Sequence, residues 1–123
     1  MTSADLKAMT VAQLVENFAI MGVKQNKALL WDDLSEFNSL YGQIDAIREE
    51  LKGRPGDQRR ALLELFNHRD LQVRLNAAKA TLAVAPDQAR AMLEHIKERH
   101  RGPQRGDAGM CLWALDQGIF VPK

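Results

Sequence analysis

The chain has 123 residues, of which 46% are hydrophobic and 27% charged, and its formal net charge at neutral pH is +1. This length and composition indicate one globular domain over residues 1–123 and give no overall polyelectrolyte signal. A single cysteine excludes an internal disulfide, and no segment approaches the roughly 20 apolar residues of a membrane-spanning helix. We therefore expect a cytoplasmic protein that does not associate with membranes.

The N-terminal part of the chain predicts two helices. The first begins at Thr10, where TVAQ has the form of a capping box, and its apolar residues recur three and four positions apart. A pair of adjacent aspartates separates it from a second helix, predicted over 34–52. The glycines and proline of GRPGD, residues 53–57, end this second helix. We expect residues 10–53 to form a helix pair.

The rest of the chain predicts four shorter helices, over 58–67, 71–84, 86–99 and 107–117. Asp70 and Asp107 are placed to cap two of them, and Pro86 fits the first turn of another. Alternating β-branched segments, which would indicate strands, are nearly absent. The sequence therefore predicts an all-α fold of about six helices.

The last four predicted helices look like two copies of one unit. A shift of 33 residues aligns the pair Ala77-Ala78 with Met110-Cys111. A period in the low thirties with paired helices is typical of an α-solenoid, although a plain helical bundle would also produce a match this loose. On the solenoid interpretation, the two helix pairs span 57–85 and 86–118.

The segment HRDLQVRLNAAKATLAVAP resembles the second half of a HEAT repeat, in which small alanines let neighbouring helices approach closely. A wider resemblance covers nearly the whole chain. It rests on RPGDQRRALLELFNHRDLQVRLNAAKATLAVAP, GDAGMCLWALDQGIFVPK and WDDLSEFNSLYGQI, which are similar to a family of short bacterial proteins catalogued as a domain of unknown function. That resemblance implies a small HEAT/armadillo-like α-α superhelical array, and it implies no catalytic residue.

Charge is distributed unevenly along the chain. Residues 1–53 contain 5 Lys/Arg and 8 Asp/Glu, whereas residues 54–123 contain 12 and 8. Most of these basic residues fall at the turns between predicted helices. We expect them to form an interaction surface together with a tryptophan at a helix end: Arg54, Arg59, Arg60, Arg69, Lys97, Arg99, Arg101, Arg105 and Trp31. A solvated, salt-bridged surface would have the same composition.

The sequence predicts no catalytic, metal-binding or cofactor-binding residues. His95 and His100 are five residues apart, so we expect them to diverge on a helix rather than share a metal ion. The glycines of RGPQRGDAG follow no predicted strand and match no nucleotide-binding pattern. Cys111 is expected to lie in the core, and Gly109 to mark a close contact between helices.

These features favour a non-enzymatic protein-interaction module of a bacterium, with an immunity-like or regulatory role. The alternative is nucleic-acid binding through the basic inter-helix turns. The expected partner is an unidentified protein. A homodimer is a further option, since Trp31, Phe120 and other terminal apolar residues offer a patch for it.

Overall fold

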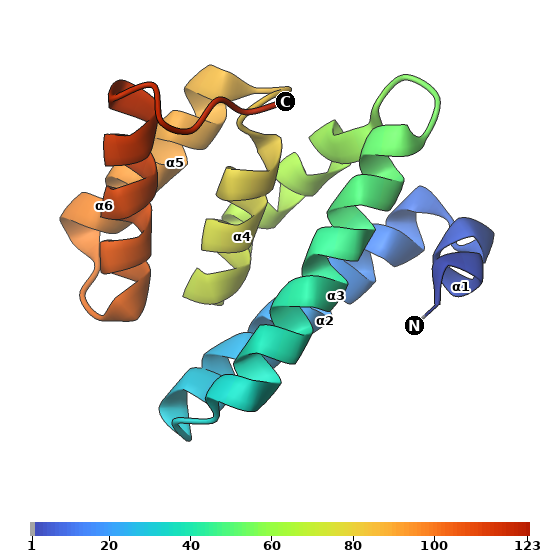
Figure 1. Cartoon of the computed structure of the whole chain (residues 1–123), viewed down its shortest axis with the longest axis horizontal. Coiled ribbons are helices and arrows are strands. Elements are labelled where there is room, and N and C mark those ends of the chain that lie inside the picture. The colour runs from blue at the N-terminus through green and yellow to red at the C-terminus, as the bar shows by residue number, and fades with distance from the viewer. Residues whose placement is uncertain (1) are drawn as a thin grey trace.

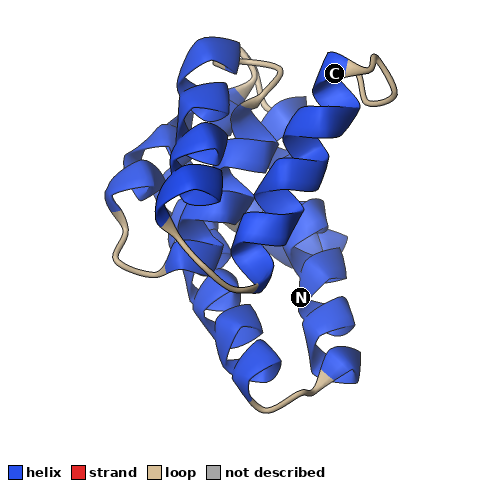
Figure 2. Cartoon of the chain, turned by 90° about the vertical axis from the view of Figure 1, so that its left-hand side faces the viewer, coloured by secondary structure: helices blue, strands red, loops and turns tan. Residues whose placement is uncertain are grey.

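The computed structural model describes residues 2–123 and consists of helices joined by short loops (Figures 1 and 2). The α-helices are α1 (Ser3–Ala8), α2 (Val11–Leu30), α3 (Leu34–Gly53), α4 (Leu71–Thr81), α5 (Pro86–Arg99) and α6 (Pro103–Asp116), and a 3₁₀ helix, η1 (Gln58–Asn67), precedes α4. No residue from 2 to 123 lies in a strand, which confirms the all-α prediction. Within the same residues, no helix combines the length and the apolar character needed to cross a membrane.

The prediction missed α1, a helix of six residues with one buried side chain, Leu6. A capping box starts it: the Thr2 hydroxyl accepts the Asp5 amide at 3.2 Å, and the Asp5 carboxylate accepts the Thr2 amide at 2.9 Å. A helix with one buried leucine has no periodic apolar stripe, so the spacing of apolar residues in the sequence could not predict it.

Two further helices differ from the prediction. The segment 58–67 has the predicted bounds but winds as a 3₁₀ helix. Helix α6 begins at Pro103, four residues before Asp107, because the first helical position tolerates a residue without an amide hydrogen. The prediction that Asp107 caps α6 is therefore wrong. Its carboxylate instead accepts Lys79 Nζ of α4 at 2.9 Å.

Helix α4 lies between two hydrophobic cores. One core combines it with α1, α2, α3 and η1, and the other combines it with α5 and α6. Val73, Ala77 and Ala80 belong to the first core, whereas Leu75, Ala78 and Leu82 belong to the second. Both faces of α4 are therefore buried along most of its length.

Helices α2 and α4 approach each other closely at Gly22. A Cβ atom there would lie 2.8 Å from Val73 Cγ2 and 3.2 Å from Val73 Cα, so a side chain has no room. The prediction of a close contact at Gly109 is wrong, because a Cβ atom there would meet only Lys97 Cδ, at 3.9 Å. An inward-facing glycine, rather than a helical glycine as such, marks the close contact.

Helices α2 and α3 form a long hairpin whose tip, at residues 31–33, projects away from the rest of the chain, while α1 lies near its opposite end (Figure 1). The segment from η1 to α6 packs beside this hairpin (Figure 1).

Candidate functional site

A groove of about 440 Å³ separates α3 from α4. Its lining is apolar in part, with one residue from α2, two from α3, two on or just after α4 and three from the C-terminal segment: Phe18, Tyr41, Ile44, Ala80, Ala83, Phe120, Val121 and Pro122. Two helices therefore form its walls, and the C-terminal segment lies at one end.

Charged side chains complete the lining. The basic ones are Arg48, Lys52, Arg59, Lys79 and Lys123, and the acidic ones are Asp45 and Glu49. Five basic side chains against two acidic ones give the groove a positive balance in a chain whose net charge is only +1. A concave surface with an excess of one sign of charge favours ligands of the opposite sign.

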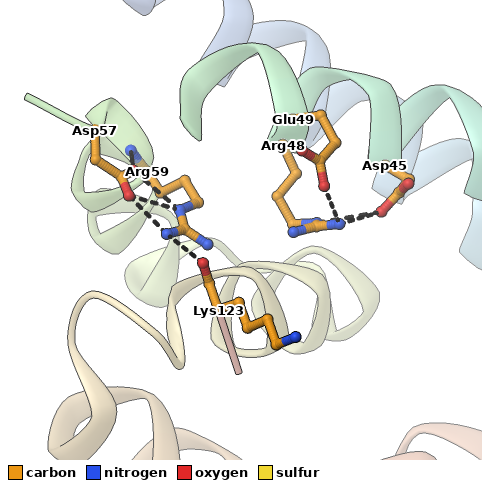
Figure 3. A network of polar contacts seen from close by, with 6 residues as sticks. All are labelled: Asp45, Arg48, Glu49, Asp57, Arg59 and Lys123. Carbon is orange, nitrogen blue, oxygen red and sulfur yellow. Dashed lines mark hydrogen bonds and ion pairs between the residues drawn. The ribbon is translucent and has the colours of Figure 1, made fainter. Parts of the chain in front are cut away.

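Arg48 lies along the α3 wall between the two acidic residues of the groove (Figure 3). Its Nη2 atom is 2.7 Å from Asp45 Oδ1 and 2.9 Å from Glu49 Oε1. Burial opposes the charged form, but the two carboxylates outweigh it and raise the pKa of Arg48 above its ordinary value. Arg48 therefore offsets one of the two acidic charges of the groove, while Arg59 and Lys79 are paired with Asp57 and Asp107.

Arg59 fixes the end of the groove (Figure 3). Only 4% of the residue is exposed, its Nη2 atom is 2.6 Å from Asp57 Oδ2, and the same nitrogen donates to the Lys123 carbonyl oxygen at 3.4 Å. The Arg59 hydrogen bonds lower the pKa of Asp57, although partial burial of that carboxyl acts in the opposite direction. Arg59 thus joins the turn before η1 to the C-terminal segment, and it is buried where the sequence suggested an exposed residue.

A network of side-chain amides holds α4 in place beneath the groove. Asn76, which lines the groove, donates to Gln25 Oε1 of α2 at 2.7 Å and accepts from Gln72 Nε2 at 3.0 Å. Gln104 of α6 donates in turn to Gln72 Oε1 at 3.1 Å. The three glutamines are at most 6% exposed, so each bond replaces water that burial has removed. The network joins α2, α4 and α6.

This network was not predicted from the sequence, because glutamine and asparagine in helices usually face solvent. One feature of the sequence did indicate that Gln25 is buried. Gln25 follows Phe18 by seven residues and Gly22 by three, so it shares their inward face.

The basic residues that were expected to form an interaction surface do not lie together. Arg54 donates to the carbonyl oxygens of Leu6 and Met9 at 3.0 and 2.8 Å and so anchors the turn between α1 and α2. Arg60 donates to the Val84 carbonyl oxygen at 2.6 Å. These two arginines, like Arg59, make contacts within the fold at the end where α3 leads into η1.

The other predicted residues are exposed and lie elsewhere: Arg69, Lys97, Arg99, Arg101 and Arg105 on or near the turns before α4 and between α5 and α6, and Trp31 at the hairpin tip. The α5–α6 turn and the α3–η1 turn are at opposite ends of the molecule (Figure 1). The basic turns therefore do not form one continuous surface.

The histidines and the cysteine offer no catalytic arrangement. The rings of His95 and His100 lie edge to face with centroids 5.6 Å apart, so the prediction that they diverge is wrong, because His100 follows the end of α5 in an extended conformation. Across residues 2–123, no three His, Cys, Asp or Glu side chains are grouped as metal ligands. Cys111 is half-buried beside the second core, and burial raises the pKa of its thiol.

A protein-family model described as a domain of unknown function (DUF2019) matches residues 12–116. No curated protein matches the chain. Among solved structures, the crystal structure of the protein RPA1889 from Rhodopseudomonas palustris CGA009 is similar, with 54% sequence identity and a TM-score of 0.94 over 96% of this chain and 98% of that chain. The family match spans most of the helices described above, and the chain belongs to the DUF2019 family.

Proposed function

We propose that this protein is a non-enzymatic interaction module of a bacterium, which binds an acidic segment of a partner protein in the groove between α3 and α4. The observation that carries the proposal is the lining of the groove, where apolar side chains lie beside five basic and two acidic ones. Apolar contact supplies affinity, whereas the charged rim selects the partner and accelerates its association. The role that this suits is regulatory or immunity-like.

The groove offers side chains that the fold itself does not use. Among the described residues, Lys52 forms no ion pair, whereas Arg48, Arg59 and Lys79 each have a carboxylate partner. Tyr41 is 58% exposed, and tyrosine is among the residues that contribute most to protein interfaces. An acidic segment with an apolar side chain would meet Lys52 with its carboxylate and Tyr41, further along α3, with its apolar side chain.

The proposal includes a HEAT-like interpretation of the C-terminal region. On this view, η1–α4 and α5–α6 are two successive helix pairs, spanning 57–85 and 86–118, and the α2–α3 hairpin covers one end of the stack. The fully buried Ala77 and Ala78 support it, because stacked repeats need small residues where helices meet. Arrays of this kind bind partners along extended concave surfaces.

Nucleic-acid binding is the alternative proposal, supported by the exposed arginines around the α5–α6 turn, Arg99, Arg101 and Arg105. It predicts binding of single- or double-stranded oligonucleotides that weakens steeply with salt and is lost on Arg101→Glu. Absence of such binding at low ionic strength would eliminate it.

Photo-crosslinking in the native host tests the groove directly. A photoreactive amino acid is placed at Ala83, an exposed residue of the groove, and in a matched chain at Ala91, an exposed residue of α5. We expect a discrete protein adduct from position 83 and none from position 91, with an acidic crosslinked peptide in the partner.

A charge-matched pair of variants completes the test. Lys52→Glu should abolish the adduct, whereas Lys97→Glu, an equal change of charge on α5, should leave it intact. Equal adducts from positions 83 and 91, or an adduct insensitive to Lys52→Glu, would contradict the proposal.

A further inference from the structure

The outward face of α2 carries apolar side chains that no other element covers. Helices α3, α4 and η1 pack against the remaining faces of α2. Ile20 and Val23 are 44% and 42% exposed, and Leu30 at the end of the helix is 81% exposed. Positions 20, 23, 27 and 30 are spaced by three and four residues, so they form one stripe along the helix. A stripe of this kind is typical of a surface that meets another helix.

Opposite charges flank the centre of this stripe symmetrically. Glu16 lies four residues before Ile20, and Lys27 lies four residues after Val23. Both are exposed, and neither belongs to an ion pair within the described part of the chain. Along the helix, the stripe therefore has an acidic residue, Glu16, then the apolar Ile20 and Val23, then the basic Lys27. Its midpoint lies between Ile20 and Val23.

We propose that a second copy of this chain binds the outward face of α2, with the two α2 helices antiparallel. A two-fold axis at the midpoint places Ile20 of each copy against Val23 of the other. The same axis places Glu16 of each copy opposite Lys27 of the other, so two ion pairs close the apolar centre. A two-fold interface must be complementary to itself, and this stripe meets that condition.

The alternative orientations fit less well. A parallel pairing in register would bring Glu16 against Glu16 and Lys27 against Lys27, and like charges repel. The antiparallel pairing also extends the apolar contact, because it brings Trp31 of each copy near Ala12 of the other. Twenty residues of helix are about 30 Å long, so the contact runs along most of α2.

This interface is independent of the groove, since α3 and α4 contact other faces of α2. Two copies joined in this way would carry two grooves, both open to partners. The proposed dimer can therefore be tested independently of the proposed function.

Sedimentation equilibrium over a dilution series tests the dimer. The chain has a mass of 13.8 kDa, and we expect the apparent mass to rise with concentration to twice that value. Val23→Glu places a charge at the apolar centre and should leave a monomer at every concentration. Ile119→Glu, the same kind of change at a 66% exposed residue of the C-terminal segment, should leave the dimer intact.

Charge exchange tests the antiparallel arrangement. Glu16→Lys and Lys27→Glu should each weaken the dimer, because each places like charges opposite one another. The double variant should restore it, since the pairs re-form with their signs exchanged. Far-ultraviolet circular dichroism checks that every variant keeps its helices. A wild-type monomer at all concentrations, a dimer indifferent to Val23→Glu, or a double variant no tighter than the single ones would overturn the proposal.

Discussion

The two sides of α4 differ in how they meet their neighbours. Toward α5 and α6, Leu75, Ala78 and Leu82 pack against Leu93, Ile96 and Leu112, and none of these six residues is more than 5% exposed. Toward α3, a groove of about 440 Å³ remains, lined by seven charged side chains. On one side apolar residues alone fill the gap between adjacent helices, whereas on the other side charged residues line the gap together with apolar ones.

What holds α4 beside the groove is its contact with α2, not with α3. The absent side chain of Gly22 lets Val73 approach the α2 backbone, and the amide network bonds Asn76 to Gln25. The contact between α4 and α2 therefore sets the width of the groove. The fold does not need an apolar contact between α4 and the charged wall that α3 forms. The variants in the first two predictions weaken this contact between α2 and α4.

The largest effect is expected from Gly22→Ala. The new Cβ atom would lie 2.8 Å from Val73 Cγ2 and 3.2 Å from Val73 Cα, so α4 must shift. We expect the free energy of unfolding to fall by about 2 kcal/mol, because overpacking outweighs the higher helix propensity of alanine. Gly109→Ala is the matched control, where the Cβ atom has space and stability should rise by up to about 1 kcal/mol. Urea denaturation measures both, and equal effects at the two glycines would contradict the close contact.

A smaller loss is expected from Gln72→Met, which keeps the volume of the side chain but removes its hydrogen bonds. Asn76 loses a donor to its side-chain oxygen, and Gln104 loses the shorter of its two acceptors and keeps Asn26 Oδ1 at 3.4 Å. The loss of these two hydrogen bonds should lower the free energy of unfolding by about 1–2 kcal/mol. Gln88→Met, on the exposed side of α5, should change it by less than about 0.5 kcal/mol. Indistinguishable denaturation curves for the two variants would show that the network contributes nothing.

Asp57→Asn should give an effect that depends on pH. Hydrogen bonds from Arg59 hold the pKa of Asp57 below its ordinary value in the folded chain, so its ionised form stabilises the fold. This contribution is complete above the unfolded pKa of about 4 and is lost as pH falls through the lower folded value. Asparagine tolerates the positive φ of 51° at this position, so the variant isolates the charge. The stability difference between wild type and variant should shrink as pH falls below about 4, and a constant difference would refute the assignment.

The smallest effect concerns Cys111, on the closed side of α4. Burial raises the pKa of this thiol, with Asp107 acting in the same direction and Lys79 against it. Alkylation by iodoacetamide at neutral pH should therefore be slower in the folded chain than in urea, because little thiolate is present. A rate equal to that of the unfolded chain would mean that the second core is more open than the structure indicates.

The features that could be predicted from the sequence are those set locally. Thr10 with Gln13 starts α2, and Asp70 caps α4, because each contact spans two or three residues. The groove could not be predicted, since its lining comes from α2, α3, η1, α4 and the C-terminal segment. The positions of arginine side chains could not be predicted, because Arg54 donates to backbone carbonyl oxygens within the fold whereas Arg101 is exposed to solvent. Only the carbonyl oxygens placed by the fold distinguish these two roles.

The central claim is that the groove between α3 and α4 binds acidic segments, and selection from a random peptide library on the immobilised chain tests it most directly. We predict selected peptides that combine acidic residues with an apolar or aromatic side chain. Their binding should be lost with Lys52→Glu and retained with Lys97→Glu. Selected peptides without an acidic bias, or binding that Lys52→Glu leaves unchanged, would contradict the claim.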